Sequence, residues 1–266
     1  KKEALEIVKS SGYELENLSD EFKKDKEIVL QAVKQNGTVI QFADVSLKKD
    51  EEIVLEAIKN NGYAIEYVDQ IFKKDKKIVL EAIKDDGTLI SYADKSLTKD
   101  RDVILLAVKA HGAALEYADD AFKKDREIVL EAVKQHGSAI QYADENFRKD
   151  NEIVLEAVKK DGYALEYADD SFKKKKEIVL TAVKCEGSAI QFADDSFKKD
   201  KEIVYEAVKQ YGDALEYVDD TFKKNKEIVL EAVKSSGRSF DYVDEDLKYD
   251  KDLIIEAVRQ YHSSAL

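Results

Sequence analysis

The residues most able to do chemistry surround a glycine at 134–147, where the sequence reads KQHGSAIQYADENF. His136 has the side chain of a general base, and Tyr142 that of a general acid. The carboxylates of Asp144 and Glu145 are oxygen ligands for a metal, or a pair of the kind that cleaves glycosidic bonds. Since the chain has only 3 histidines, this stretch is the first candidate for an active site.

The stretch belongs to a repeat of 25 residues. The 10 glycines lie 25 residues apart, from Gly12 to Gly237, without insertion or deletion. We predict one domain over residues 1–266, with a partial repeat at 1–24, nine full repeats over 25–249 and a partial repeat at 250–266. The chemistry-bearing residues can therefore be compared with ten parallel copies of themselves.

The comparison favours structural roles for these residues. In the other repeats the position of His136 holds many different polar residues, which predicts a solvated helix end. His111 lies one repeat away, but two histidines are too few ligands for a convincing zinc site. Tyr142 aligns with Tyr or Phe in nine of ten repeats, so we expect its ring to pack in the core. Asp144 aligns with Asp in nine repeats and with Ser19 in the first, which indicates a helix cap. Cys185 has no histidine nearby in the sequence to activate it, and no second cysteine to pair with.

Two helical segments must position these side chains. In eight of ten repeats an Asp precedes an apolar-periodic run such as Ile128 to Val133, which predicts an N-cap and a helix of about eleven residues. We expect the recurring glycine to close that helix in the left-handed conformation. A shorter apolar stripe from Ala139 to Ala143 predicts a second helix, followed by a turn in which Phe147 returns to the core. Short helices of this kind gain stability by stacking, so the predicted fold is all-α, an α-solenoid with a right-handed superhelix.

Charge and composition narrow the function classes. A net charge of −13 argues against a general nucleic-acid or anionic-membrane binder. Lys or Arg fills the tenth position of every repeat, from Lys9 to Arg259, which is typical of a solvated face with pairs such as Glu131–Lys134. A second basic ridge at 173–176 lies among acidic neighbours. No apolar run is long enough for a membrane span and no signal peptide is evident, so we expect a soluble chain and favour a cytoplasmic one.

A weaker period of 50 residues is superimposed on the 25-residue repeat. The repeats containing Gly37, Gly87, Gly137 and Gly187 continue GTVIQFAD, GTLISYAD, GSAIQYAD and GSAIQFAD. Those between them continue GYAIEYVD, GAALEYAD, GYALEYAD and GDALEYVD. We interpret this alternation as growth by duplication of repeat pairs.

The strings DREIVLEAVKQHGSAIQYADENF and KDNEIVLEAVKKDGYALEYADDSF are similar to short repeats described as a domain of unknown function, DUF4116. The resemblance covers essentially the whole chain and rests on the cores D-x-E-[IV]-V-L-x-A-V-x-x-x-G and A-L-x-Y-A. It implies helical repeats with interaction roles. It supplies no catalytic residues and no cofactor.

The function that we expect is a non-enzymatic scaffold that binds a protein or peptide, favouring a basic partner. Solenoids bind along extended surfaces, and the free positions after the glycine would form one here. The alternatives are a structural spacer or self-assembling rod and, with less support, nucleic-acid binding through the basic ridge. The candidate partner-binding residues are Tyr63, Glu66, Glu116, Tyr163, Glu166 and Glu216.

The two ends bear on self-association. In the first repeat, Glu3, Glu14 and Asn17 replace mostly apolar residues, which predicts a polar N-terminal cap. The last repeat has His262 in place of glycine and stops at Leu266 within its second helix, which predicts an open or truncated C-terminal face.

Overall fold

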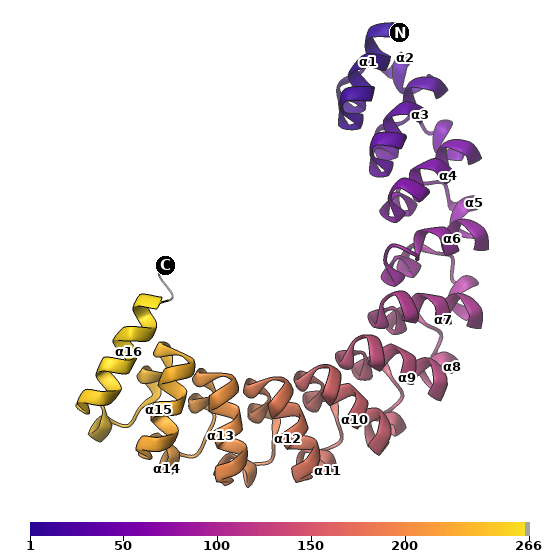
Figure 1. The fold of residues 1–266 in the computed structure, drawn as a ribbon. Coiled ribbons are helices and arrows are strands. Elements are labelled where there is room, and N and C mark those ends of the chain that lie inside the picture. Colours follow the sequence, from indigo (N-terminus) through magenta and orange to yellow (C-terminus); the bar gives the residue numbers. More distant parts are fainter. Residues whose placement is uncertain (264–266) are drawn as a thin grey trace. The chain divides into compact units, whose positions relative to one another are not determined.

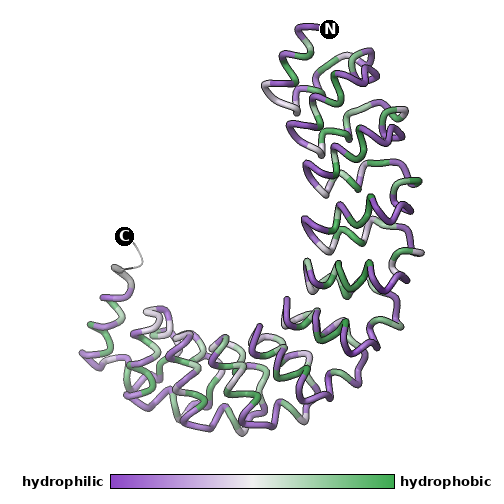
Figure 2. Tube along the Cα trace, turned by 45° about the vertical axis from the view of Figure 1, so that its right-hand side comes forward, coloured by the Kyte–Doolittle hydropathy of each residue, from purple (hydrophilic) through white to green (hydrophobic). Residues whose placement is uncertain are grey.

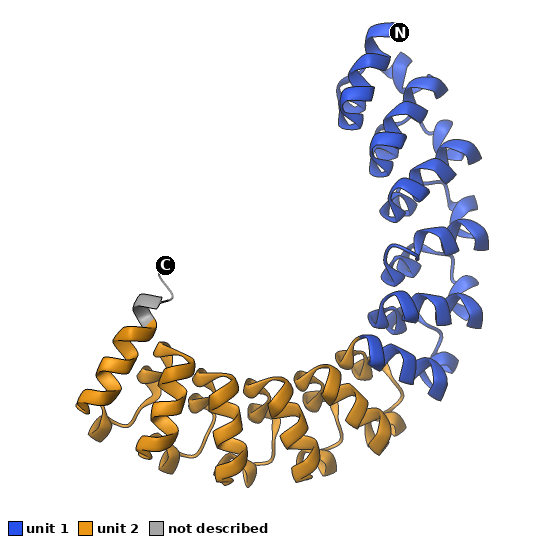
Figure 3. Ribbon diagram, in the orientation of Figure 1, with its two compact units in different colours: residues 1–135 blue, residues 136–266 orange. Residues whose placement is uncertain are grey.

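The computed structural model describes residues 1–263, with side chains over 1–260. The side chain of His262 and the predicted stop at Leu266 lie outside the described residues. Contacts divide the chain into two compact units, residues 1–135 and 136–266 (Figure 3). Each unit is described separately below.

Each of the first ten repeats has a long α-helix, a short 3₁₀ segment after the glycine and a corner of three to five residues, and the last partial repeat has the long helix α16 (Figure 1). The long helices are α1 Lys2–Ser10, α3 Lys26–Gln35, α4 Glu51–Asn60, α6 Lys76–Ala82, α7 Arg101–Ala110, α9 Arg126–Gln135, α10 Asn151–Lys160, α12 Lys176–Cys185, α13 Lys201–Gln210, α15 Lys226–Ser235 and α16 Lys251–Ser263. The 3₁₀ segments are η1 Gly12–Asn17, η2 Gly37–Phe42, η4 Gly62–Glu66, η5 Gly87–Tyr92, η7 Gly112–Tyr117, η8 Gly137–Tyr142, η10 Gly162–Tyr167, η11 Gly187–Phe192, η13 Gly212–Glu216 and η14 Gly237–Tyr242.

The corners alternate between an α-helical turn and a 3₁₀ turn. The α-helical corners are α2 Asp20–Lys23, α5 Gln70–Lys73, α8 Asp120–Lys123, α11 Asp170–Lys173 and α14 Asp220–Lys223. The 3₁₀ corners are η3 Leu47–Lys49, η6 Leu97–Lys99, η9 Glu145–Lys149, η12 Phe197–Lys199 and η15 Glu245–Leu247. The 50-residue period of the sequence therefore has a structural counterpart in the backbone.

Within each unit the repeats stack as two layers. Successive long helices contact one another in chain order, and successive 3₁₀ segments do the same. Their shared core is built from Ile, Val, Leu and Ala, and Figure 2 shows this apolar pattern recurring along each unit. In α9, for example, Ile128, Val129, Ala132 and Val133 are fully buried. The structure is thus an all-α repeat solenoid, as predicted, while the handedness of its superhelix and the single domain over 1–266 stay predictions.

The predicted caps are confirmed. Asp125 Oδ1 accepts the backbone N–H groups of Glu127 at 3.0 Å and Ile128 at 3.2 Å, and equivalent bonds begin most of the long helices. Asp144 Oδ1 accepts the N–H of Asn146 at 3.1 Å and caps the corner η9. The long helices mostly span ten residues rather than about eleven.

The prediction of a left-handed glycine is wrong. Among the described residues no glycine has a positive φ. The reason for glycine is close packing between repeats: a Cβ on Gly62 would lie 2.5 Å from the carbonyl oxygen of Ala82 in the next long helix. The same clash, with the alanine carbonyl of the following repeat, recurs at Gly12, Gly162 and Gly187. Glycine is required by the neighbouring repeat rather than by the turn.

Candidate partner-binding surface

The six predicted binding residues all lie on 3₁₀ segments. Glu66, Glu116, Glu166 and Glu216 are exposed on η4, η7, η10 and η13. Tyr63 and Tyr163 follow their glycines with exposed fractions of 46% and 40%. We call these six residues the tyrosine–glutamate surface; half of them belong to the unit 1–135 and half to the unit 136–266.

In the first unit, Tyr63 is held by the following repeat. Its hydroxyl donates to Asp86 Oδ2 at 2.9 Å, and this bond raises the pKa of the phenol. Asp86 is itself the cap of η5, because its Oδ1 accepts the Thr88 N–H at 2.9 Å. Although partial burial opposes it, these hydrogen bonds hold the pKa of Asp86 below its usual value. The Tyr63 ring is therefore exposed yet fixed in position.

Glu66 lies beside two rings, its neighbour Tyr67 and Tyr92 of the next repeat. Both occupy the position of Tyr142 in their repeats, and we call the Tyr and Phe residues at this position the aromatic column. Burial raises the pKa of both phenols, and the Glu66 carboxylate raises it further. Lys73 lies behind this group, with its Nζ donating to the Glu66 carbonyl at 2.8 Å and 6.0 Å from the Tyr92 ring centroid. One surface thus presents a carboxylate flanked by half-buried aromatic rings.

The aromatic column is not core, contrary to the prediction for Tyr142. Its rings are half-buried in most repeats, and Tyr117 is 38% exposed. These rings lie at the last residue of a 3₁₀ segment or directly after it. Ile140, two residues earlier, is the fully buried position. Phe147 is half-buried, while its counterparts Phe72 and Phe172 are buried as predicted.

In the second unit, Tyr163 is fixed by a different partner. Its hydroxyl lies 2.5 Å from Ser188 Oγ, and its ring meets Phe192 edge-on with centroids 6.0 Å apart. Glu216 repeats the arrangement of Glu66: burial raises the pKa of Tyr217 and Tyr242, and the Glu216 charge raises it further. The same combination of carboxylate and aromatic rings therefore recurs in both units.

Sequence comparison did not single out several residues at equivalent or neighbouring positions of other repeats. Tyr13 and Tyr211 are exposed by 54% and 43% on or beside their 3₁₀ segments, as is Tyr117. Asp213 takes the place of Tyr63 in its repeat, is 7% exposed, and lies 3.8 Å from Arg238 Nε of the next repeat. In the sequence, these residues were indicated only by the variable position after each glycine. The stacked structure shows that this position faces the next repeat.

Open hollows run along the corner side of the aromatic column in the second unit. One of about 470 Å³ is lined by residues that include Arg148, Tyr167 and Asp169. Another of about 320 Å³ is lined by residues that include Lys174 and Phe192. Each hollow combines an aromatic ring with both signs of charge, so neither favours an anionic ligand.

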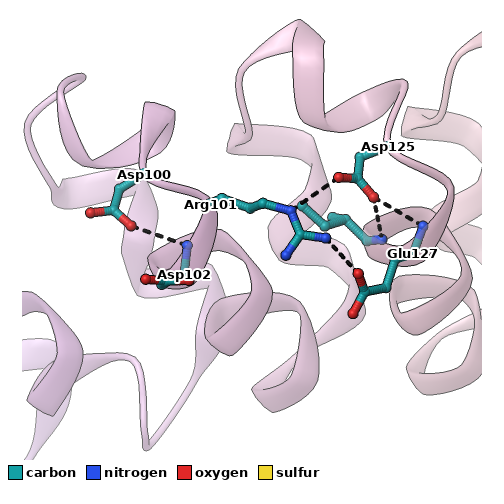
Figure 4. Close-up of polar contacts among 6 residues, drawn as sticks. Asp100, Arg101, Asp102, Asp125 and Glu127 are labelled. Carbon is teal, nitrogen blue, oxygen red and sulfur yellow. Dashed lines mark hydrogen bonds and ion pairs between the residues drawn. The ribbon is translucent and has the colours of Figure 1, made fainter.

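In several repeats the long helix begins with a basic residue that bonds to acids of the next repeat. Arg101, the first residue of α7, reaches Asp125 Oδ2 at 3.2 Å and Glu127 Oε2 at 2.6 Å in the next repeat (Figure 4). Lys26 makes the same contacts with Asp50 at 2.7 Å and Glu52 at 2.8 Å. The hydrogen bond from Lys26 lowers the pKa of Asp50, and the bonds to Asp50 and Glu52 raise the pKa of Lys26. A cap carboxylate thus joins its own helix to the preceding one.

The basic ridge at the corner is likewise paired. Lys173 lies 3.1 Å from Asp170, Lys174 4.0 Å from Asp194, and Lys176 2.8 Å from Asp200. Lys175 Nζ lies 3.9 Å from the Phe172 ring centroid. Lys48 and Lys73 instead donate to backbone carbonyls. Acidic partners therefore offset the charges of Lys173, Lys174 and Lys176, whereas the partners of Lys175 are neutral.

The remaining chemical candidates have structural positions. His136 is exposed at the start of η8. His111, the histidine of the preceding repeat, belongs to the other unit. Over the described part of the chain, no three His, Cys, Asp or Glu side chains are placed to hold a metal ion. Burial raises the pKa of the Cys185 thiol. Its sulfur accepts a hydrogen bond from the Gly162 N–H, as Asn60 Oδ1 accepts one from the Gly37 N–H in another repeat. A raised pKa makes this thiol a poor nucleophile at neutral pH.

Comparison with known proteins gives one family. The model of a domain of unknown function (DUF4116) matches residues 3–48, 36–73, 50–98, 75–123, 100–148, 125–173, 175–223 and 225–266. Most matches span nearly two of the 25-residue repeats. No curated protein and no solved structure matches the chain. Within the described residues, no helix combines the length and apolar character needed to cross a membrane. Because the matches tile nearly all of it, the chain belongs to the DUF4116 repeat family.

Proposed function

We propose that the chain is a non-enzymatic scaffold that binds a basic protein or peptide through the tyrosine–glutamate surface. The observation that carries the proposal is where the exposed aromatic residues lie. Among the residues whose side chains are described, Tyr13, Tyr63, Tyr117, Tyr163 and Tyr211 are exposed on or beside 3₁₀ segments, and Tyr249 is exposed at a corner. Tyrosine is enriched in protein interfaces because it buries a large area with little loss of conformational freedom.

The charges around these rings indicate the chemistry of the partner. Exposed glutamates occur on the same segments at 66, 116, 166 and 216. The carboxylates of Glu66 and Glu216 lie beside tyrosine rings, whereas the carboxylates of the caps are paired with cations across repeats. A Lys or Arg side chain of a partner would gain both the carboxylate and an aromatic face.

A peptide selection tests the proposal. A library of random peptides is selected on the unaltered chain, and the enriched peptides are measured by fluorescence polarisation. Changing Glu66, Glu116, Glu166 and Glu216 to Lys should weaken binding of basic peptides at least roughly tenfold, about the effect of losing one charge-assisted contact. The matched control changes Asp120, Glu145, Asp195 and Asp220 to Lys, exposed acids of the corners that alter net charge equally.

The two variants separate the outcomes. Loss of binding in the surface variant alone supports the proposal. Equal loss in both variants means that only net charge matters, and retention in both removes the tyrosine–glutamate surface as the site. Enrichment of acidic peptides in place of basic ones would also contradict the proposed partner.

A further inference from the structure

Three successive corners of the first unit lack an acid that the other corners have at the position of Glu145. The residues at this position in the three corners are Val45, Gln70 and Lys95. The other corners have Asp20, Asp120, Glu145, Asp170, Asp195, Asp220 and Glu245. Each of the segments 44–49, 69–74 and 94–99 contains one acid and two lysines. In a chain with a net charge of −13, these corners have an excess of positive charge.

The missing acid goes with different contacts of the lysine three residues later. Lys173 lies 3.1 Å from Asp170, and the corresponding pair recurs in three other corners. Lys48 and Lys73 instead donate to backbone carbonyls of their own repeats, at 2.6 and 2.8 Å. The side chain of Val45 is 66% exposed. An apolar side chain therefore lies on the surface where other corners present a paired carboxylate.

Ile71 is a second apolar exception, one position further along its corner. Several other corners have Ser or Thr there, and its hydroxyl donates to the capping Asp, as Ser171 Oγ does to Asp169 at 2.6 Å. Ile71 keeps only the backbone bond to Asp69, at 3.1 Å, and its side chain is 65% exposed. The exchange removes a hydrogen bond and leaves apolar surface in water, which costs free energy. Exposed apolar residues among charged ones are typical of interaction sites.

Backbone hydrogen bonds join the three corners into one edge of the first unit. The Asp69 N–H donates to the Lys48 carbonyl at 3.2 Å, and the Asp94 N–H donates to the Lys73 carbonyl at 2.8 Å. The exposed apolar and basic side chains of these corners therefore lie along a continuous stretch of backbone. We call the following residues the corner patch: Val45, Lys49, Ile71, Lys74 and Lys95.

The lysines of the corner patch carry charges that a partner can reach. Lys49 Nζ lies 3.6 Å from Asp69, and Lys74 Nζ lies 3.9 Å from Asp94, with 59% and 65% of the lysine side chains exposed. Lys95 is exposed and has no ion pair within the described part of the chain. Ion pairs that are this long and this exposed contribute little to stability, so carboxylates of a partner can replace them.

Two apolar side chains among three exposed lysines fit an acidic segment that also carries apolar residues. Its carboxylates would pair with Lys49, Lys74 and Lys95, and its apolar side chains would cover Val45 and Ile71. A nucleic-acid backbone would pair with the lysines but offer no apolar side chains to the other two residues. We propose that the corner patch binds an acidic peptide segment with apolar residues, presented by another protein. It is a second interaction surface, with a charge preference opposite to that of the tyrosine–glutamate surface.

The test gives the corner patch the residues that other corners already hold. The restored variant carries Val45→Asp, Ile71→Ser and Lys95→Asp, which copy the corners at 169–174 and 194–199. Peptides are selected on the unaltered full chain from a library rich in Asp, Glu, Leu and Phe, and their binding is measured by fluorescence polarisation. The restored variant should keep its helicity by circular dichroism and bind these peptides at least roughly tenfold more weakly.

Two further variants separate the patch from net charge. Lys160→Asp and Thr181→Glu together change net charge as much as the restored variant, in the unit 136–266, and also copy residues of other repeats, Asp85 and Glu156. This control should bind the peptides as the unaltered chain does. Ile71→Ser alone leaves net charge unaltered and should weaken binding about threefold, through lost apolar contact.

The outcomes decide between the patch and its alternatives. Weaker binding in the restored variant but not in the control supports the proposal. Equal loss in both, full binding by the restored variant, or a library that yields no binding peptide overturns it. Binding to phosphatidylserine vesicles that the restored variant loses, without any selected peptide, would assign the patch to a membrane and also overturn it. Basic peptides selected for the tyrosine–glutamate surface should bind the restored variant normally, so either proposal can fail alone.

Discussion

At the scale of single residues, the repeat assigns most side chains to the junction with the next repeat. The glycine at each helix end is the clearest example, because a Cβ on Gly62 would meet the carbonyl oxygen of Ala82. Cys185 is another, since its thiol accepts the Gly162 N–H and occupies the place that Asn60 and Ser235 hold elsewhere. Residues that look reactive in the sequence are thus used to hold the layers together.

The steric role of glycine can be separated from a conformational role by two substitutions. Gly62→Ala should destabilise the fold by about 1–3 kcal/mol, the usual cost of overpacking. Gly62→Asn should cost at least as much, because its Cβ meets the same carbonyl. If glycine were needed for a left-handed backbone, Asn would be the milder change. Chemical denaturation of the two variants measures the difference, and a clearly milder Asn variant would contradict the steric account.

The cap carboxylates predict a loss of stability in acid. The hydrogen bond from Lys26, with the N–H of Ile53, lowers the pKa of Asp50 in the folded state, although burial opposes the shift. A lowered folded pKa means that the stabilisation is complete above the unfolded value, about 3.9, and is lost as pH falls through the folded value. The melting temperature should therefore fall below about pH 4.

Asp50→Asn isolates the titration from the cap. Asn caps as well as Asp, as Asn225 does in its own repeat through the N–H groups of Glu227 and Ile228. The variant should be less stable than the unaltered chain at neutral pH but lose less on acidification. Parallel pH dependences of the two proteins would show that Asp50 contributes nothing to the acid response.

At the scale of elements, the sequence predicts what is local and misses what depends on the neighbouring repeat. The cap Asp144 and the buried Ile140 follow from spacing along a single helix, and both are confirmed. The half-buried aromatic column, the reason for the glycines and the bonds from Arg101 all involve atoms about 25 residues away. The variability of the glutamate positions between repeats predicted that these side chains are exposed. It did not predict that aromatic rings lie beside Glu66.

One trace of these bonds between repeats was present in the sequence. Where Glu51 replaces the first basic residue of a helix, Lys77 replaces the acid opposite it in the next repeat. Where Asn151 replaces that basic residue, Lys175 replaces the cap Asp, and Lys175 Nζ donates to Asn151 Oδ1 at 3.4 Å. Paired exchanges of this kind identify contacting positions without any other sequence.

A designed charge exchange tests this junction. Arg101→Glu should lower the melting temperature, because it places a third carboxylate beside Asp125 and Glu127. Adding Glu127→Lys should recover part of the loss, as the natural exchange at 51 and 77 does. The control adds Glu145→Lys instead, an exposed acid that is not one of the ion-pair partners of Arg101, namely Asp125 and Glu127. If both additions restore the melting temperature equally, the effect depends only on net charge and not on the contact between repeats.

At the scale of the whole molecule, the period of two repeats links architecture to the proposed binding surface. The repeats with α-helical corners all have a glutamate at the same position: Glu16, Glu66, Glu116, Glu166 and Glu216. The family model also spans about two repeats in most matches. The pair of repeats is therefore the unit in which the exposed carboxylates recur, and a partner that reads the surface should do so with a spacing of two repeats.

The position of a bound peptide tests the central claim most directly. Amide hydrogen exchange of the chain, with and without a selected basic peptide, reports which segments the peptide covers. We expect protection at 63–67, 113–117, 163–167 or 213–217, and little change along the long helices α4, α7, α10 and α13. Protection confined to the long helices or to the corners, with these 3₁₀ segments unchanged, would contradict the account.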